Sequence, residues 1–344
     1  MSDTALAGGL DLVAGRALVV RDPVVWFALS PGDRPLVAVG DEVAAGTAIA
    51  YRHRETHVEE VRRPEGALRA MPEPGGWWAG TQAVRGRVGG SRGTPAGELL
   101  FATAGRWHVA VGEHPETLDA PADATIEGVR PGAGIAVRLH AAAVPGAGAI
   151  GGPSRGRLVT LPADGDLRGG SLDVSLAGAI VVVGARVDAE TLTRARATGI
   201  RGIVVGGLSE KDRRDFLASE ARQRAGYHGM APFAVLALDG AMRRPIATPV
   251  RAVFSAIEGR EVAIVGDPPL LAFDPTGVEI PEIPADLVRF RTGPAAGREG
   301  TWVGAVGMRR FRSGVHLSAG LVRLDDGEEV AAPLGDLERY IRPD

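Results

Sequence analysis

The sequence predicts a multidomain protein in which an all-β segment is followed by a small parallel α/β domain and then by a second, smaller all-β domain. Three observations support this prediction. Gly and Pro interrupt short apolar runs throughout residues 1–172, and apolar runs alternate with helical patterns over residues 173–267. A proline-rich linker at residues 268–284 precedes further short strand patterns at residues 285–344.

The composition is that of a globular protein and removes several functional classes. The 344 residues include 45% hydrophobic and 24% charged residues, which suits two or three domains with sizeable cores. The 49 glycines and 24 prolines lie below the level that marks disorder, so turn-rich β structure explains them better. Because the chain has no cysteine, disulfides, thiolate metal ligands and cysteine nucleophiles are excluded.

Charge and hydropathy patterns bear on location and partners. The first twenty residues contain Asp3, Asp11 and Arg16 and lack a basic start followed by an apolar stretch, so no secretory signal is expected. No apolar run approaches the ~20 residues that span a bilayer, and we therefore expect a cytoplasmic protein. The net charge of -3 argues against nucleic-acid affinity over the whole surface but leaves room for a local basic patch.

Two short motifs in the first segment suggest one β structure. Gly40-Asp41-Glu42-Val43-Ala44-Ala45-Gly46-Thr47-Ala48-Ile49 resembles the hammerhead turn of biotinyl and lipoyl carrier domains, and residues 120–132 resemble the returning half. Together the two halves would close a barrel-sandwich hybrid with an insertion between them. The family holds its cofactor on a lysine near this turn, whereas the single lysine here is Lys211. We therefore expect no covalently attached cofactor.

The second segment alternates strands and helices. Apolar runs predict strands at 179–183, 202–205, 233–238 and 262–265. Asp188 is the expected N-cap of a helix at 189–197, and Ser209, with Asp212 at the capping-box position, is the expected N-cap of a helix at 210–225. A third helix is expected from Thr248 to Gly259. This alternation predicts a parallel sheet covered on both faces, as in flavodoxin-like or Rossmann-like domains.

The C-terminal segment resembles a known module. Residues 288–303, read as Val-Arg-Phe-Arg-Thr-Gly-Pro-Ala-Ala-Gly-Arg-Glu-Gly-Thr-Trp-Val, are similar to the KOW motif of SH3-like barrels in ribosomal proteins and transcription elongation factors. A hairpin over 321–330 and a short stretch at 333–337 would complete such a barrel. The resemblance covers about 55 residues of the chain.

The KOW resemblance implies contact with RNA or protein through a loop of the barrel. Arg309, Arg310 and Arg312 surround Phe311 in the expected loop, which suits phosphate contact and base stacking, and Trp302 is a further candidate anchor. From residue 285 onward, however, nine arginines face nine acidic residues, so the module has no dominant positive field. Protein docking or a purely structural role therefore stands beside nucleic-acid contact.

The α/β segment offers an alternative site for a small anionic ligand. Ligands in such sheets bind beyond the carboxyl ends of the strands, near helix N-termini. The residues expected there are Gly184, Arg186, Asp188, Gly206, Gly207, Ser209, Lys211, Asp239, Arg243 and Arg244. These loops lack both a dinucleotide fingerprint and a P-loop, and helix capping alone explains Asp188 and Ser209.

Other short patterns are weaker candidates. Serine-elbow matches at 89–93 and 152–156 lack a following helix, as does the dinucleotide-like pattern at 146–151. In a strand, His53 and His57 would lie ~13 Å apart at ~3.3 Å per residue, too far to share one ion, so no metal site is expected. Trp77 and Trp78 fit either a partner surface or packing over a barrel.

The sequence therefore favours a non-enzymatic adaptor or assembly component that docks on a protein or ribonucleoprotein partner. The alternative is an enzyme or ligand sensor in which Arg186, Ser209 and Arg243 hold an anionic group.

Overall fold

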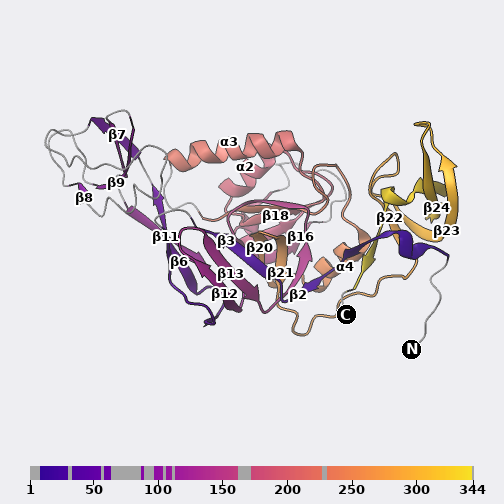
Figure 1. Cartoon of the computed structure of the whole chain (residues 1–344), viewed down its shortest axis with the longest axis horizontal. Coiled ribbons are helices and arrows are strands. Elements are labelled where there is room, and N and C mark those ends of the chain that lie inside the picture. Colours follow the sequence, from indigo (N-terminus) through magenta and orange to yellow (C-terminus); the bar gives the residue numbers. More distant parts are fainter. Residues whose placement is uncertain are drawn as a thin grey trace. The chain divides into compact units, whose positions relative to one another are not determined.

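The computed structural model describes residues 8–29, 33–55, 58–62, 87–88, 97–103, 106–110, 113–161, 172–226 and 231–342 (Figure 1). It is a mixed α/β protein with 45% of its residues in strands and 15% in helices, and none of its several described sheets closes into a barrel. The chain divides into two compact units. Residues 1–23, 141–216 and 232–344 form the first unit, and residues 24–140 and 217–231 form the second.

A nine-stranded sheet is the centre of the first unit. Its strands, in spatial order, are β15 (Gly148–Gly151), β19 (Ala234–Ala237), β18 (Gly202–Val205), β17 (Ala179–Val182), β16 (Ser154–Thr160), β20 (Glu261–Gly266), β21 (Pro269–Phe273), β14 (Ala142–Pro145) and β2 (Val20–Arg21). Strands β16 to β19 are parallel, and each of the other pairings is antiparallel.

The expected strands of the α/β segment are present, but the sheet is mixed rather than wholly parallel. Strands β17, β18 and β19 are parallel as predicted. The fourth expected strand lies within β20, which is antiparallel to β16 and forms a hairpin with β21, so the prediction of a wholly parallel sheet is wrong. A strand buried on both faces has a continuous apolar run whichever way it runs, and its sequence therefore does not reveal its direction.

Three helices flank this sheet and match the predicted ones. They are α2 (Ala189–Ala197), α3 (Glu210–Gly226) and α4 (Thr248–Ala256). The Asp188 carboxylate accepts a hydrogen bond from the Thr191 amide at 2.7 Å, which confirms Asp188 as the N-cap of α2. The Asp212 amide likewise donates to the Ser209 hydroxyl at 3.1 Å at the start of α3.

Alternating residues of the strands place a core on each face of the sheet. Ile180 and Val182 of β17 pack in one core with Phe254 of α4. Val181, between them, packs in the other core with Leu192 of α2. Successive residues of a strand point to opposite faces of the sheet, so alternate residues share a core. The helices therefore cover both faces, as the apolar strands require.

The second unit contains three antiparallel sheets. The first contains β3 (Val24–Ala28), β13 (Gly134–Leu139), β12 (Ala124–Arg130) and β5 (Glu42–Val43). The second contains β11 (Glu113–Asp119), β6 (Ala48–Glu55) and β4 (Arg34–Pro35). The third contains β7 (Val58–Arg62), β10 (Arg106–Ala110), β9 (Gly97–Thr103) and β8 (Arg87–Val88).

The two motifs that resemble halves of a hammerhead lie side by side in the second unit. The Gly46 amide donates to the Ala120 carbonyl at 2.8 Å, and the Ile126 amide donates to the Asp41 carbonyl at 2.9 Å. The Asp123 carboxylate also accepts from the Ala45 amide at 2.8 Å. Segments almost eighty residues apart thus satisfy one another's backbone groups.

A six-stranded sheet completes the first unit and contains both ends of the described chain. Its strands, in spatial order, are β1 (Ala14–Ala17), β26 (Leu337–Ile341), β22 (Leu287–Phe290), β23 (Glu299–Arg310), β24 (His316–Leu324) and β25 (Glu329–Pro333). Strand β1 is parallel to β26, and the remaining pairs are antiparallel. Strand β1 has the sequence AGRA, whose apolar signal is too weak to have predicted this pairing.

The remaining short elements are the 3-10 helices η1 (Leu10–Leu12), η3 (Val174–Leu176) and η4 (Leu334–Asp336).

Trp302 lies in the core of the six-stranded sheet. It is 3% exposed and packs with Leu10, Val288 and Leu337. The indole lies directly over Gly320, where an added Cβ would be 2.1 Å from the ring. Trp302 alternates with exposed neighbours along β23 and points inward, so its place in this structure is that of a packing residue rather than a surface anchor.

Replacing this indole tests its core role. Trp302→Ala is expected to lower the free energy of unfolding by about 3–5 kcal/mol, because the truncation leaves a cavity. Chemical denaturation measures the change. The adjacent Val303 is 38% exposed and provides the control, for which Val303→Ala should change stability by less than about 1 kcal/mol. Equally small effects for both variants would contradict the packing role.

Candidate functional site

The structure brings together the loops that were expected to line an anion site. Arg186, after β17, forms an isolated parallel bridge with Gly207, after β18. The Asp239 amide, after β19, donates to the Gly206 carbonyl at 2.7 Å. The carboxyl ends of the three parallel strands therefore meet at one edge, where parallel sheets commonly bind ligands.

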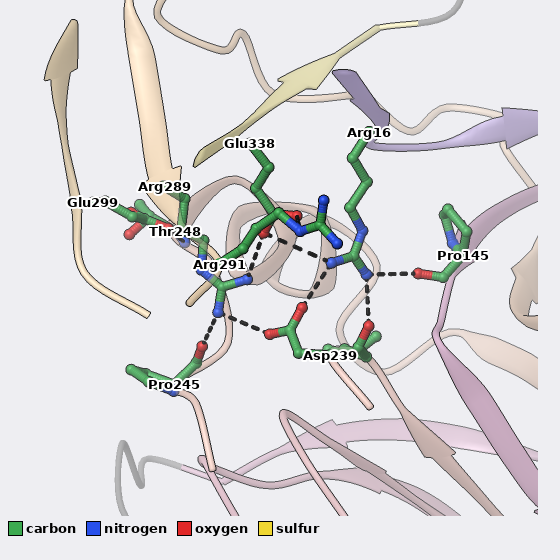
Figure 2. A network of polar contacts seen from close by, with 10 residues as sticks. Arg16, Pro145, Asp239, Pro245, Thr248, Arg289, Arg291, Glu299 and Glu338 are labelled. Atoms are coloured by element: carbon green, nitrogen blue, oxygen red, sulfur yellow. Dashed lines mark hydrogen bonds and ion pairs between the residues drawn. The ribbon is translucent and has the colours of Figure 1, made fainter. Parts of the chain in front are cut away.

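Asp239 does not face an open site at this edge, because two arginines occupy its carboxylate (Figure 2). Arg16 of β1 donates through Nη1 to Oδ1 at 2.6 Å, and Arg289 of β22 donates through Nη2 to Oδ2 at 2.8 Å. The side chains of Asp239 and Arg289 are 2% and 1% exposed. The predicted ligand residue is thus the centre of a buried ion network.

Backbone carbonyls and a second carboxylate complete the network. Arg16 also donates to the Leu238 carbonyl at 2.7 Å, and Arg289 donates to the Pro245 carbonyl at 2.6 Å. Glu338 of β26 accepts from Arg289 Nη1 at 3.2 Å. The two buried guanidinium groups thus face two carboxylates, and the half-exposed Arg291 lies 3.9 Å from the other oxygen of Glu338. Both carboxylates are therefore occupied by arginines of the protein itself.

The network shifts the pKa values of Asp239 and Arg289 in the directions that favour their charged forms. Burial alone would raise the pKa of Asp239, but hydrogen bonds and charge from Arg289 and Arg16 hold that pKa below its ordinary value. Burial alone would lower the pKa of Arg289, but the hydrogen bond to Asp239 and its charge raise that pKa. Tyr340 lies beside the network, 5.6 Å from its ring centroid to the Arg16 guanidinium carbon, and burial raises its pKa to about 12.

The helix N-termini at this edge are likewise satisfied by internal partners. Asp212 accepts from Arg186 at 2.9 Å and from the Ser209 hydroxyl at 2.5 Å. Burial alone would raise the pKa of Asp212, but these two hydrogen bonds lower it. Lys211 pairs with Asp215 at 2.8 Å, one helical turn along α3. Arg186, Ser209 and Lys211 therefore stabilise the start of α3.

Gly206 and Gly207 are needed for close packing of the backbone. A Cβ on Gly206 would lie 2.0 Å from the Arg244 carbonyl oxygen, and one on Gly207 would lie 1.9 Å from the Met242 carbonyl oxygen. Their amides donate to the carbonyls of Gly184 and Ala185 at 3.1 and 3.0 Å. These amides therefore do not cradle an external phosphate in this structure. Arg243 is exposed in the following loop, and Arg244 is buried there.

The expected arginine loop lies at the end of a long hairpin made by β23 and β24. Residues 306–318, here called the hairpin arm, extend past the neighbouring strands, because β24 first meets β25 at Ala319 and β22 meets β23 only near Gly300. Arg309, Arg310 and Arg312 are exposed, and Phe311 is half-buried. In Figure 1 the hairpin of β23 and β24 projects beyond the other strands of its sheet.

The weaker motifs have structural explanations or lie outside the described residues. The Ser154 hydroxyl is buried and donates to the Arg201 carbonyl at 2.7 Å, and residues 148–151 form strand β15. His53 and Glu55 lie in strand β6. Ser91, His57, Trp77 and Trp78 lie outside the described residues. Among the residues that are described, no group of three or more His, Cys, Asp or Glu side chains is arranged to hold a metal ion.

Comparison with known proteins gives no assignment. No known family model and no curated protein sequence matches the chain. In the described part of the chain, no helix has the length and apolar character needed to cross a membrane.

The residues of the ion network other than Asp239 were missed by the sequence analysis. Arg16, Arg289 and Glu338 belong to strands that are far apart in the chain. One signal was available: Arg289 lies between Val288 and Phe290, both of which are buried. A charged residue in a short apolar run indicates either an exposed strand face or a buried partner, and the sequence does not distinguish the two.

Asp239→Asn tests the ion network. It is expected to lower the free energy of unfolding at pH 7 by about 3–5 kcal/mol, because it leaves two guanidinium groups partly uncompensated. In the wild type the pKa of Asp239 is lowered in the folded state. The carboxylate therefore contributes its full stabilising free energy above the ordinary Asp pKa of about 4, and this stabilisation is lost as the pH falls through the folded-state pKa. The stability difference between the two proteins should therefore shrink below about pH 4 in urea titrations.

The control is Asp215→Asn, which removes an exposed partner of Lys211 and should cost less than about 1 kcal/mol. A stability difference for Asp239→Asn that does not change with pH would contradict the assigned ionisation of Asp239.

Gly207→Ala tests whether this glycine is required for packing. It is expected to lower the free energy of unfolding of the ligand-free protein by about 1–3 kcal/mol, because the new methyl group overlaps the Met242 carbonyl. Thermal and chemical denaturation measure the loss. Gly266→Ala is the control, since no heavy atom lies within 4 Å of an added Cβ there. An unchanged stability for Gly207→Ala would instead favour a glycine kept open for a ligand.

Proposed function

We propose that the protein is a non-enzymatic adaptor or assembly component that docks on a protein or ribonucleoprotein partner through its C-terminal module. In this proposal residues 285–344 are a KOW-type SH3-like domain, residues 1–172 are a barrel-sandwich-like domain with an insertion, and residues 173–267 are a flavodoxin-like or Rossmann-like domain. The hairpin arm is the part of the C-terminal module that makes the contact.

The hairpin arm carries this proposal because its exposed side chains are those of a docking surface. Val306, Met308, Val315 and Leu317 are 42%, 66%, 51% and 41% exposed. They account for four of the twelve large hydrophobic residues exposed in the described chain. Three arginines lie among them, and the arm contains no acidic residue. Exposed apolar residues gathered in this way mark interaction sites.

The alternative, an enzyme or sensor that binds an anion at the strand ends, has less support. Asp239 is held by Arg16 and Arg289, and Arg186 is paired with Asp212. Loop amides at this edge bond to carbonyl groups of neighbouring loops. The proposal therefore places the functional contact on the arm.

A charge-removal experiment tests docking through the arm. The full-length protein and a variant combining Arg309→Gln, Arg310→Gln and Arg312→Gln are purified with an affinity tag from the source cells over a range of salt concentrations. The wild type should retain partners that the variant loses, and retention should weaken as salt rises. Mass spectrometry and nucleic-acid quantification of the retained material measure the outcome.

A charge-matched variant provides the control. Arg298→Gln, Arg323→Gln and Arg342→Gln remove three exposed arginines from the same module but leave the arm intact. This control should retain the wild-type partners. If the two triple variants behave alike, net charge rather than the arm governs retention and docking through the arm is wrong.

A further inference from the structure

We infer that the hairpin arm fits a groove on a protein partner with acidic side chains at its rim and aliphatic side chains at its centre. This inference rests on the proposed docking function and adds the chemistry of the partner. It follows from the residue types of the arm, from their distribution over its two faces and from the unpaired state of its arginines.

The residue types of the arm are those that protein interfaces favour. Arg, Met and Phe are enriched where proteins meet, whereas Lys, Glu and Asp are depleted. The arm contains three arginines, Met308 and Phe311 and no Lys, Glu or Asp. Arginine is also frequent among the residues that dominate the free energy of binding. This composition favours contact of the arm with a protein surface rather than its exposure to solvent.

Both faces of the arm carry apolar and cationic groups. Met308 pairs with Ser318 and Arg310 pairs with His316, and these four side chains share one face because alternate residues of a strand point the same way. Arg309 pairs with Leu317 on the opposite face. Val315 lies at the tip, where its carbonyl accepts from the Phe311 amide at 3.0 Å. A flat surface would cover only one face, whereas a groove covers both.

The arginines of the arm have no partner within the described part of the chain. None of Arg309, Arg310 and Arg312 has a carboxylate within ion-pair distance there, whereas elsewhere in the same module Arg298 pairs with Asp326 and Arg323 with Glu329. Arg339 and Arg342 donate to backbone carbonyls instead, so the described arginines of the module outside the arm have carboxylate or carbonyl partners. Carboxylates at the rim of a groove would complement the charges of the arm.

The aliphatic character of the arm argues against single-stranded nucleic acid as the partner. Binding of unpaired bases relies on aromatic side chains on which the bases stack. The arm has one apolar aromatic residue, Phe311, which is half-buried, and one exposed imidazole, that of His316. Its exposed apolar side chains are Val306, Met308, Val315 and Leu317. These aliphatic groups are suited to contacts with apolar side chains in a protein groove.

Site-specific photocrosslinking in the source cells tests the inference. A photoreactive phenylalanine replaces Leu317 in the full-length protein, and a control variant carries it instead at the exposed turn residue Asp325. Crosslinked material is treated with nuclease, and the attached molecule is identified by mass spectrometry. Position 317 should yield a nuclease-resistant crosslink to a protein peptide that contains more Asp and Glu than Lys and Arg, together with aliphatic residues.

Two sets of substitutions, each added to the crosslinking variant at position 317, separate the contributions of charge and apolar contact. The charge set is Arg309→Gln, Arg310→Gln and Arg312→Gln, and the apolar set is Met308→Ser with Val315→Ser. Each set should reduce the crosslinked yield by about tenfold or more, as expected for loss of interface anchors. Leu12→Ser with Val174→Ser, at residues that are 60% and 72% exposed outside the arm, should leave the yield unchanged.

The failures of the two proposals are distinguishable. A crosslink from position 317 to nucleic acid, or a yield unaffected by the apolar set, would leave docking through the arm intact and overturn the partner chemistry inferred here. A crosslink to lipid would overturn both proposals. Equal background yields from positions 317 and 325 would overturn docking through the arm itself, and the partner chemistry with it.

Discussion

The position of Asp239 between two arginines is the constraint on which the first unit depends. Its carboxylate joins the end of β19 to Arg16 in β1 and Arg289 in β22, and Glu338 in β26 closes the network. Buried charges are costly unless every one is paired, so arrangements of the two sheets that separate these groups are strongly disfavoured. Apolar packing around Trp302 and in the α/β core supplies attraction without direction, whereas the ion network requires particular residues of β1, β22, β26 and the end of β19 to lie together.

The same network occupies the sheet edge at which a ligand site was expected. Parallel sheets present their strand ends as ligand sites, yet here that edge contacts another sheet of the same unit through neutral pairs of charges. In the described C-terminal sheet Arg339 and Arg342 donate to backbone carbonyls, whereas Arg309, Arg310 and Arg312 of the hairpin arm have no side-chain partner among the described residues. Arginines with partners thus join the sheets, and exposed arginines without partners lie on the arm.

Local signals in the sequence predicted local structure well. Asp188 and the Ser209–Asp212 pair mark helix starts through hydrogen bonds to residues three positions away, so the chain alone contains the information. The direction of β20 and the partners of Arg289 depend on residues that are distant in sequence, and neither periodicity nor composition encodes them. The exposed arginine loop was predicted from its residues, whereas the inward orientation of Trp302 required the strand register and Gly320 beneath the ring.

The pairing of β1 with β26 links the order of synthesis to the order of folding. Ala14 lies opposite Glu338 in parallel register, so β1 leaves the ribosome more than three hundred residues before the strand that it pairs with. Arg16 can meet Asp239 earlier, but the second carboxylate arrives only with β26. A chain that stalls before residue 337 therefore lacks the strand that pairs with β1. The six-stranded sheet can form completely only after β26 has been synthesised.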